Sequence, residues 1–147
     1  MDELKSYVTA IDHVGIAVPD MDEAITFYRD VLGLELYHEE VNETQGVREA
    51  MMRAPGGGTG TAVQLLAPLG PDTTIGKFLA RKGPGVQQVA YRVSDIDAAT
   101  DALRAKGLRV MYEKATPGTA NSRANFVHPK DAGGVLIELV EPAPEDR

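Results

Sequence analysis

The sequence contains the same pattern twice. At an offset of 75 residues, IDHVGIAVPDMDEAITFYRD from Ile11 aligns with VQQVAYRVSDIDAATDALRA from Val86. Matching positions include Val14 with Val89, Val18 with Val93, Asp20 with Asp95, Asp22 with Asp97, Ala24 with Ala99, and Arg29 with Arg104. After a one-residue gap, VQLLAP from Val63 aligns with IELVEP from Ile137. This repetition predicts two copies of one structural unit of about 70 residues.

Each copy begins with an apolar segment that alternates with a period of two, which is typical of a half-buried strand. A helix is expected next, because Asp20 and Asp95 are good N-cap residues and Gly33 and Gly107 are good helix stops. The expected strands are 11–18, 35–41, 48–53 and 61–66 in the first copy, and 86–93, 109–114, 124–128 and 135–140 in the second. The order in each copy is therefore β-α-β-β-β.

These units predict an α+β fold. A four-stranded sheet with one open face is marginal by itself, so we expect the two tandem βαβββ units to pair into a cup-shaped sheet. We interpret residues 1–147 as a single domain with repeats at about 10–68 and 86–142. Residues 69–85 are expected to be a linker with a short helix at Ile75–Arg81, and residues 143–147 a loose tail.

The amino-acid composition limits the partners and the kinds of site that this chain can have. The chain has 22 Asp and Glu against 15 Lys and Arg, and this net charge of −7 argues against nucleic acid or an anionic membrane as a partner. The lack of cysteine excludes disulfides, thiolate zinc sites and cysteine nucleophiles. No apolar run is long enough to span a membrane, and the start MDELKSYVTA lacks the basic region of a signal peptide, so we expect a cytoplasmic protein.

Equivalent positions of the two copies hold polar side chains that we expect to converge. His13 matches Gln88, and Gln64 matches Glu138, while the neighbours of all four fill the opposite, core-facing register. One imidazole, one carboxylate and two amide oxygens suit a six-coordinate divalent ion such as Co²⁺, Mn²⁺, Ni²⁺ or Fe²⁺. By spacing alone, the same residues are equally compatible with ordinary hydrogen-bonded surface or core positions.

At these residues the sequence resembles the vicinal oxygen chelate superfamily, the glyoxalase-like proteins with paired βαβββ units around a metal. The resemblance covers nearly all of residues 10–142. Within the superfamily, the sequence resembles the methylmalonyl-CoA epimerase family in particular. The first strand and helix, IDHVGIAVPDMDEAITFYRDVLG, are generic to the superfamily. The segments EVNETQGVREAMM from Glu40 and SRANFVHPKDAGGVLIELVEP from Ser122 are more specific to the epimerase branch.

The resemblance implies roles for individual residues. His13, Gln64 and Glu138 fall on family metal ligands, and Glu49 and Glu138 on the two catalytic carboxylates. Met51, Met52, Leu66 and Val140 are expected to form the apolar wall of the site. The implied cofactor is one divalent metal ion, Co²⁺ in the first place, with Mn²⁺, Ni²⁺ or Mg²⁺ as alternatives.

One family position differs in this chain. The fourth family ligand is the second histidine of a His-His pair, and Gln87 and Gln88 stand in that place here. We take Gln88 as the fourth ligand. An amide oxygen is a weaker and harder ligand than imidazole, so the site binds metal less tightly, prefers Mn²⁺ or Mg²⁺, or is empty.

The implied function is interconversion of (R)- and (S)-methylmalonyl-CoA, or a close 2-alkylmalonyl-CoA, through α-proton removal and return by way of a metal-stabilised enolate. The resemblance also implies a homodimer and an acyl-CoA partner. Lys77, Arg81, Arg48 and Arg123 are candidates for the CoA phosphates, and nothing in the sequence selects among them. The alternative is a non-catalytic binding protein of the drug-resistance type with the same fold, which the acidic composition favours.

Overall fold

The computed structural model describes residues 7–56 and 60–144. Most of the N-terminal segment MDELKSYVTA and the end of the predicted tail lie outside the described residues. The chain forms two compact units. The first unit comprises His13–Gln87, and the second comprises the residues up to Asp12 together with those from Gln88 onward. Each unit is described by itself.

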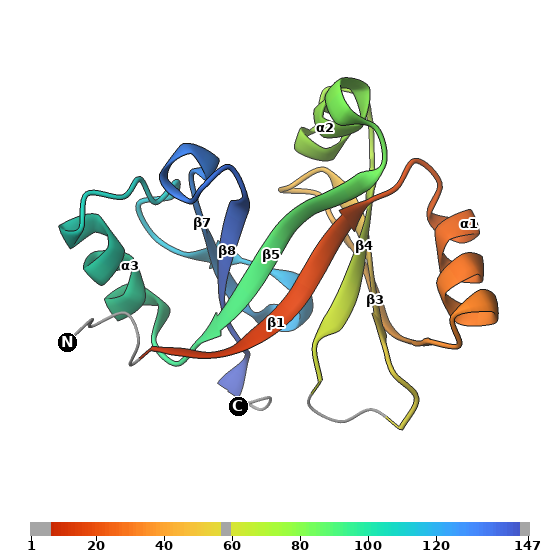
Figure 1. Ribbon diagram of the computed structural model, residues 1–147, viewed down its shortest axis with the longest axis horizontal. Coiled ribbons are helices and arrows are strands. Elements are labelled where there is room, and N and C mark those ends of the chain that lie inside the picture. Colours follow the sequence, from red (N-terminus) through yellow and green to blue (C-terminus); the bar gives the residue numbers. More distant parts are fainter. Residues whose placement is uncertain (1–6, 57–59, 145–147) are drawn as a thin grey trace. The chain divides into compact units, whose positions relative to one another are not determined.

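The first unit contains a four-stranded sheet in the order β2-β3-β4-β1 (Figure 1). Its strands are β1 (Val8–Ala17), of which the part from His13 belongs here, β2 (Glu35–Asn42), β3 (Val47–Arg53) and β4 (Ala62–Pro68). Strands β1 and β4 are parallel, and the other pairs are antiparallel. The helices are α1 (Met21–Thr26), the π-helix η2 (Phe27–Val31) and α2 (Thr74–Lys82).

The two faces of this sheet are packed differently. One face carries Met52, Leu65 and Ala50, and packs against Ile25 and Met21 of α1. On the opposite face, α2 covers one end through Ile75, Phe78 and Leu79, which pack against Ala17, Val47 and Leu66. The remainder of that second face carries the polar side chains predicted for the site.

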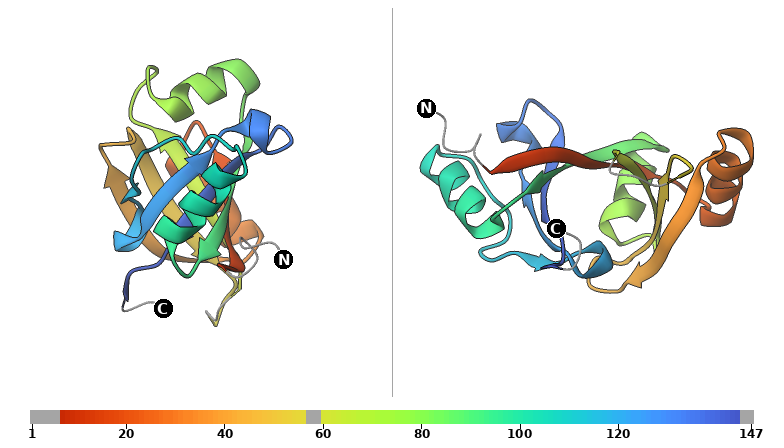
Figure 2. Two further views of the ribbon diagram at one scale, coloured as in Figure 1. Left: turned by 90° about the vertical axis from the view of Figure 1, so that its left-hand side faces the viewer. Right: turned by 90° about the horizontal axis from the view of Figure 1, so that it is seen from below.

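The second unit contains strands in the order β1-β5-β8-β7-β6, where β1 contributes its part before His13 (Figure 2). The bounds are β5 (Gly85–Val93), α3 (Ile96–Ala105), β6 (Thr116–Pro117), β7 (Arg123–Val127) and β8 (Leu136–Glu141), with 3₁₀ turns η3 (Thr119–Asn121) and η4 (Pro129–Asp131). Ile96, Ala99 and Leu103 of α3 pack on Val93 and Leu139 of the sheet.

The helix signals predicted from the sequence are confirmed. The Asp20 carboxylate accepts a hydrogen bond from the Glu23 amide, and the Asp95 carboxylate accepts one from the Ala98 amide, both at 3.0 Å. After the two helices, Gly33 and Gly107 have positive φ values of 75° and 88°, which favour glycine. The first helix differs in one respect, because its second half is the π-helix η2.

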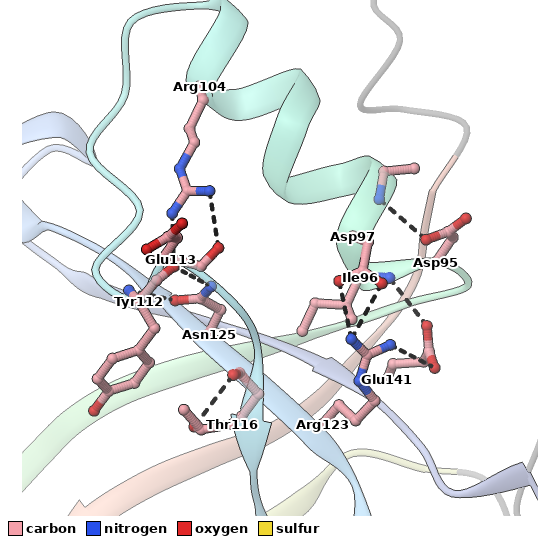
Figure 3. Close-up of polar contacts among 12 residues, drawn as sticks. Asp95, Ile96, Asp97, Arg104, Tyr112, Glu113, Thr116, Arg123, Asn125 and Glu141 are labelled. Carbon is pink, nitrogen blue, oxygen red and sulfur yellow. Dashed lines mark hydrogen bonds and ion pairs between the residues drawn. The ribbon is translucent and has the colours of Figure 1, made fainter.

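The strand predicted at Arg109–Lys114 is wrong. In that segment only Val110 forms an isolated bridge, with Val127, and a two-residue strand, β6, follows at Thr116. Figure 3 shows the reason. The Asn125 side chain makes the hydrogen bonds that a neighbouring strand would make with Tyr112: it accepts from the Tyr112 amide at 3.0 Å and donates to the Tyr112 carbonyl at 2.9 Å. Arg104 also donates to the carbonyls of Val110, Tyr112 and Glu113. Backbone pairing with the neighbouring chain is limited to Arg109 and Met111, and at Tyr112 the Asn125 side chain replaces it.

The duplication read from the sequence is preserved in strand register. His13 pairs with Ala62 in the first unit, and Gln88 pairs with Leu136 in the second, which are the equivalent positions at offsets 75 and 74. The α+β class and the doubled unit are confirmed. The interpretation of the chain as one domain stays a prediction.

The predicted linker and tail are more structured than expected. The helix expected at Ile75–Arg81 forms as α2 and packs on the first unit, and β5 begins at Gly85, within the range assigned to the linker. Ala143, at the start of the predicted tail, is buried. No helix in the described part of the chain is long and apolar enough to cross a membrane.

Candidate active site

Three strands of the first unit present polar side chains on one face of the sheet. In the register of β1, β4 and β3, Gln64 lies between Gly15 and Met51. His13 lies two residues before Gly15, and Glu49 two residues before Met51. Because side chains two residues apart on a strand share a face, His13, Gln64 and Glu49 lie on the same side of the sheet.

Glu49 and Gln64 form a buried pair. The Gln64 amide nitrogen donates to Glu49 Oε2 at 3.0 Å, and the two side chains are 3% and 5% exposed. His13 on the same face is 2% exposed. The hydrogen bond fixes one Glu49 oxygen and turns the amide nitrogen of Gln64 toward the carboxylate, so that its amide oxygen points away from Glu49.

The second unit holds a similar pair. The Gln88 amide nitrogen of β5 donates to Glu138 Oε1 of β8 at 2.7 Å, and both side chains are buried. Glu138 pairs in register with Ala90 of β5, two residues from Gln88, so the two side chains are diagonal neighbours on one face. Each unit therefore contains a buried carboxylate that receives an N–H from a glutamine side chain.

The carboxylates are not placed symmetrically in the repeat. Glu138 occupies the position equivalent to Gln64, at an offset of 74. The position equivalent to Glu49 in strand register is Ala124, because Glu49 pairs with Leu66 and Ala124 pairs with Val140. Ala124 lies on β7 and is buried. The glutamate that accepts a glutamine N–H therefore lies on β3 in the first copy and on β8 in the second.

The donor chemistry fits a divalent ion. His13 offers an imidazole nitrogen, Glu138 a carboxylate, and Gln64 and Gln88 have amide oxygens that do not face their hydrogen-bonded carboxylates. These are acceptable ligands for hard or borderline cations. Within residues 7–56 and 60–144 no group of three or more His, Cys, Asp or Glu side chains is placed to hold a metal ion. Two of the four predicted ligands are amides.

Apolar side chains border both carboxylates. Leu66 pairs in register with Glu49, Met51 pairs with Gln64, and Val140 lies two residues after Glu138 on β8, so these three predicted wall residues share the polar faces. The prediction for Met52 is wrong. Met52 is fully buried on the opposite face, in the cluster under α1, because the alternation of β3 turns it away from Glu49.

Sequence reasoning missed two aromatic residues beside Glu138. Phe126 of β7 pairs with Glu138 in register, and the Tyr112 ring packs edge-on against Phe126 with centroids 6.0 Å apart. Phe126 is the equivalent of Met51 in strand register, since Met51 pairs with Gln64 and Phe126 with Glu138. The sequence alignment of the two copies, at an offset of 74 in this region, placed Asn125 there instead. No sequence pattern indicated that Tyr112 lies near this site, because its position depends on the irregular segment that Asn125 holds.

Comparison with known proteins agrees with this fold. The family model described as "Glyoxalase/Bleomycin resistance protein/Dioxygenase superfamily" matches residues 12–126, and the chain is a member of that superfamily. The crystal structure of methylmalonyl-CoA epimerase from Mycobacterium tuberculosis is similar, with 59% sequence identity, a TM-score of 0.90 and coverage of 95% of this chain and 92% of that chain.

Two further relatives narrow the class. A methylmalonyl-CoA epimerase in complex with methylmalonyl-CoA and NH4+ is 46% identical, with a TM-score of 0.89 and coverage of 93% of this chain and 96% of that chain. The ethylmalonyl-CoA/methylmalonyl-CoA epimerase of Cereibacter sphaeroides is 37% identical over 132 residues, covering 88% of this chain and 95% of that protein. The chain belongs to the methylmalonyl-CoA epimerase family, whose members are isomerases. The comparisons give no support to the alternative of a non-catalytic binding protein.

Proposed function

We propose that this protein interconverts the two hands of methylmalonyl-CoA, or a close 2-alkylmalonyl-CoA: one carboxylate removes the α-proton and a second carboxyl group returns a proton to the opposite face. The observation that carries the proposal is the pair of buried, amide-held carboxylates, Glu49 and Glu138, in a member of the epimerase family. Racemisation at one carbon needs a base on each face of the substrate, and two carboxylates on different strands meet that need.

In the proposed reaction Glu49 and Glu138 exchange roles. For one hand of the substrate, one carboxylate takes the α-proton and the other, already protonated, returns a proton to the opposite face. For the other hand the direction is reversed. Gln64 and Gln88 each hold one carboxylate oxygen, which orients the second oxygen for proton transfer and reduces the reorientation needed during the reaction. Leu66, Val140 and Phe126 exclude water from the carboxylates.

His13, Gln64, Gln88 and Glu138 are the residues that would hold the divalent ion expected for the superfamily. When bound, such an ion supplies positive charge that stabilises the negative charge developing next to the thioester carbonyl. Co²⁺ is the proposed ion, with Mn²⁺, Ni²⁺ and Mg²⁺ as alternatives. Support comes from the donor set of one imidazole, one carboxylate and two amides.

The finer parts of the assignment are also proposals. We infer a homodimer in the cytoplasm, with the acyl-CoA thioester as partner. The dimer rests on the family resemblance and on the exposed edge strand β2, whose outward side chains include Tyr37 and Val41.

The proposed function is tested by NMR of the α-proton of methylmalonyl-CoA in D₂O. The purified protein is used as isolated, after chelation, and after adding back Co²⁺, Mn²⁺ or Mg²⁺. Loss of the α-proton signal that depends on the metal supports the epimerase chemistry and the metal together. Folded protein that exchanges no α-proton under any of these conditions would contradict the proposed function.

A further inference from the structure

Almost all arginines in the described part of this acidic chain have an ion-pair or hydrogen-bond partner. Six described arginines form ion pairs with Asp or Glu, and Arg104 donates to three backbone carbonyls. Arg48 contacts Asp22 at 4.0 Å, and Arg123 donates to Asp97 at 2.9 Å, so both earlier candidates for the CoA phosphates are occupied. Of the arginines in residues 7–56 and 60–144, Arg81 has no such partner.

Arg81 lies on α2, a helix whose charged residues are all positive. Helix α2 also carries Lys77 and Lys82, and its sequence TIGKFLARK contains no acidic residue. Lys77 and Arg81 are four residues apart, so they share one face of the helix, and both are exposed. All the charged residues of this helix are therefore positive, in a chain with a net charge of −7.

The helix is fixed on the face that carries Glu49. Its apolar side packs against Leu66, which pairs in register with Glu49. Its N-terminus is held by Thr73, whose hydroxyl accepts from the Gly76 amide and donates to the Gly70 carbonyl at 2.7 Å. A Cβ at Gly76 would lie 2.5 Å from that same carbonyl oxygen, so this close approach requires glycine. The cationic residues therefore stand on a helix that is anchored to the sheet on the face that carries Glu49.

We propose that Lys77 and Arg81 bind the phosphate groups of the CoA nucleotide. The inference rests on the proposed function and extends it to the nucleotide end of the substrate. A guanidinium and an ammonium on one helix face suit phosphate oxygens, the guanidinium by two parallel hydrogen bonds. They also offset the repulsion between an anionic protein and an anionic thioester.

The test compares two substrates in the double variant Lys77→Ala/Arg81→Ala. One substrate is methylmalonyl-CoA, and the other is methylmalonyl-pantetheine, which lacks the nucleotide. The expected KM for the CoA thioester rises about three- to tenfold at low ionic strength with kcat unchanged, while the KM for the pantetheine thioester stays the same. At high salt the difference between variant and wild type shrinks, because exposed charges are screened.

Lys114→Ala is the matched control, since it removes an exposed positive charge from the second unit and leaves α2 unchanged. An equal KM increase for both substrates, no increase for either, or the same increase in the control would overturn the proposal. Binding of free CoA by calorimetry separates this proposal from the proposed function. Binding that the double variant weakens, in a protein without α-proton exchange, would support the phosphate site and contradict the epimerase chemistry.

Discussion

At the residue scale, each of the two proposed catalytic carboxylates, Glu49 and Glu138, is held by the amide of a glutamine side chain. Gln64 and Gln88 each donate an N–H to a buried glutamate, at 3.0 Å and 2.7 Å. Gln88 stands where the resemblance places a family histidine, and the structure shows that its amide can orient Glu138 directly. The substitution thus retains a hydrogen-bond donor next to the carboxylate and replaces the proposed imidazole ligand by an amide.

Gln88→His tests the proposed role of this residue as a ligand. An imidazole binds late first-row metals better than an amide oxygen, so the affinity for Co²⁺ is expected to rise by about tenfold or more. Calorimetric titration of the metal-free protein with Co²⁺ measures this change. Gln87→His is the matched control, because Gln87 alternates to the other side of β5. Equal Co²⁺ affinity in the wild type and Gln88→His would show that residue 88 is not a ligand.

At the scale of elements, sequence patterns predicted strands and helices wherever backbone pairing is regular. They failed at 109–114, where the alternation of apolar residues predicted a strand. In the structure the Asn125 side chain, and not a neighbouring strand, pairs with the backbone of Tyr112. This competition depends on a residue from another part of the chain, which local periodicity does not contain. The π-helical second half of the first helix was missed for a related reason, because helical periodicity does not distinguish α from π turns.

Asn125→Ala is expected to destabilise the second unit by about 1–3 kcal/mol, since it leaves the Tyr112 N–H without its side-chain acceptor and removes one of the two side-chain donors to the Tyr112 carbonyl. Urea unfolding measures the change. Glu113→Ala, an exposed neighbour, is the control and is expected to change stability by less than about 0.5 kcal/mol. A similar small effect for Asn125→Ala would show that Asn125 does not hold this segment.

The turn η4 gives a pH-dependent prediction. Hydrogen bonds from the Arg109 side chain and amide lower the pKa of Asp131 from its ordinary 3.8 to about 2. A carboxyl whose pKa is depressed by folding contributes stability that is present above the unfolded pKa and lost as the pH falls through the folded one. The stability difference between wild type and Asp131→Asn is therefore expected to shrink between pH 4 and pH 2.

Urea unfolding of both proteins across this pH range checks the prediction. Ser94→Ala provides a control, because it changes an exposed side chain in a loop and adds no titrating group. A constant difference between wild type and Asp131→Asn from pH 5 to pH 2 would show that the Arg109–Asp131 pair does not lower the carboxyl pKa.

At the scale of the whole molecule, duplication explains why so much could be predicted from the sequence. Two aligned copies identified the strand order and the equivalences of His13 with Gln88 and Gln64 with Glu138, and the strand registers of both units agree with them. The same argument did not identify Glu49, because Ala124 replaces it in the second copy. Only the family resemblance pointed to Glu49, and its hydrogen bond with Gln64 became visible in the structure.

The central claim, that Glu49 serves one face of the substrate, is tested most directly by Glu49→Gln with each hand of methylmalonyl-CoA supplied separately in D₂O. The account predicts that interconversion falls by at least about a hundredfold, while one hand alone still exchanges its α-proton through Glu138. NMR follows exchange, and chiral analysis of the product follows interconversion. Continued interconversion, or equal loss of exchange for both hands, would contradict the account.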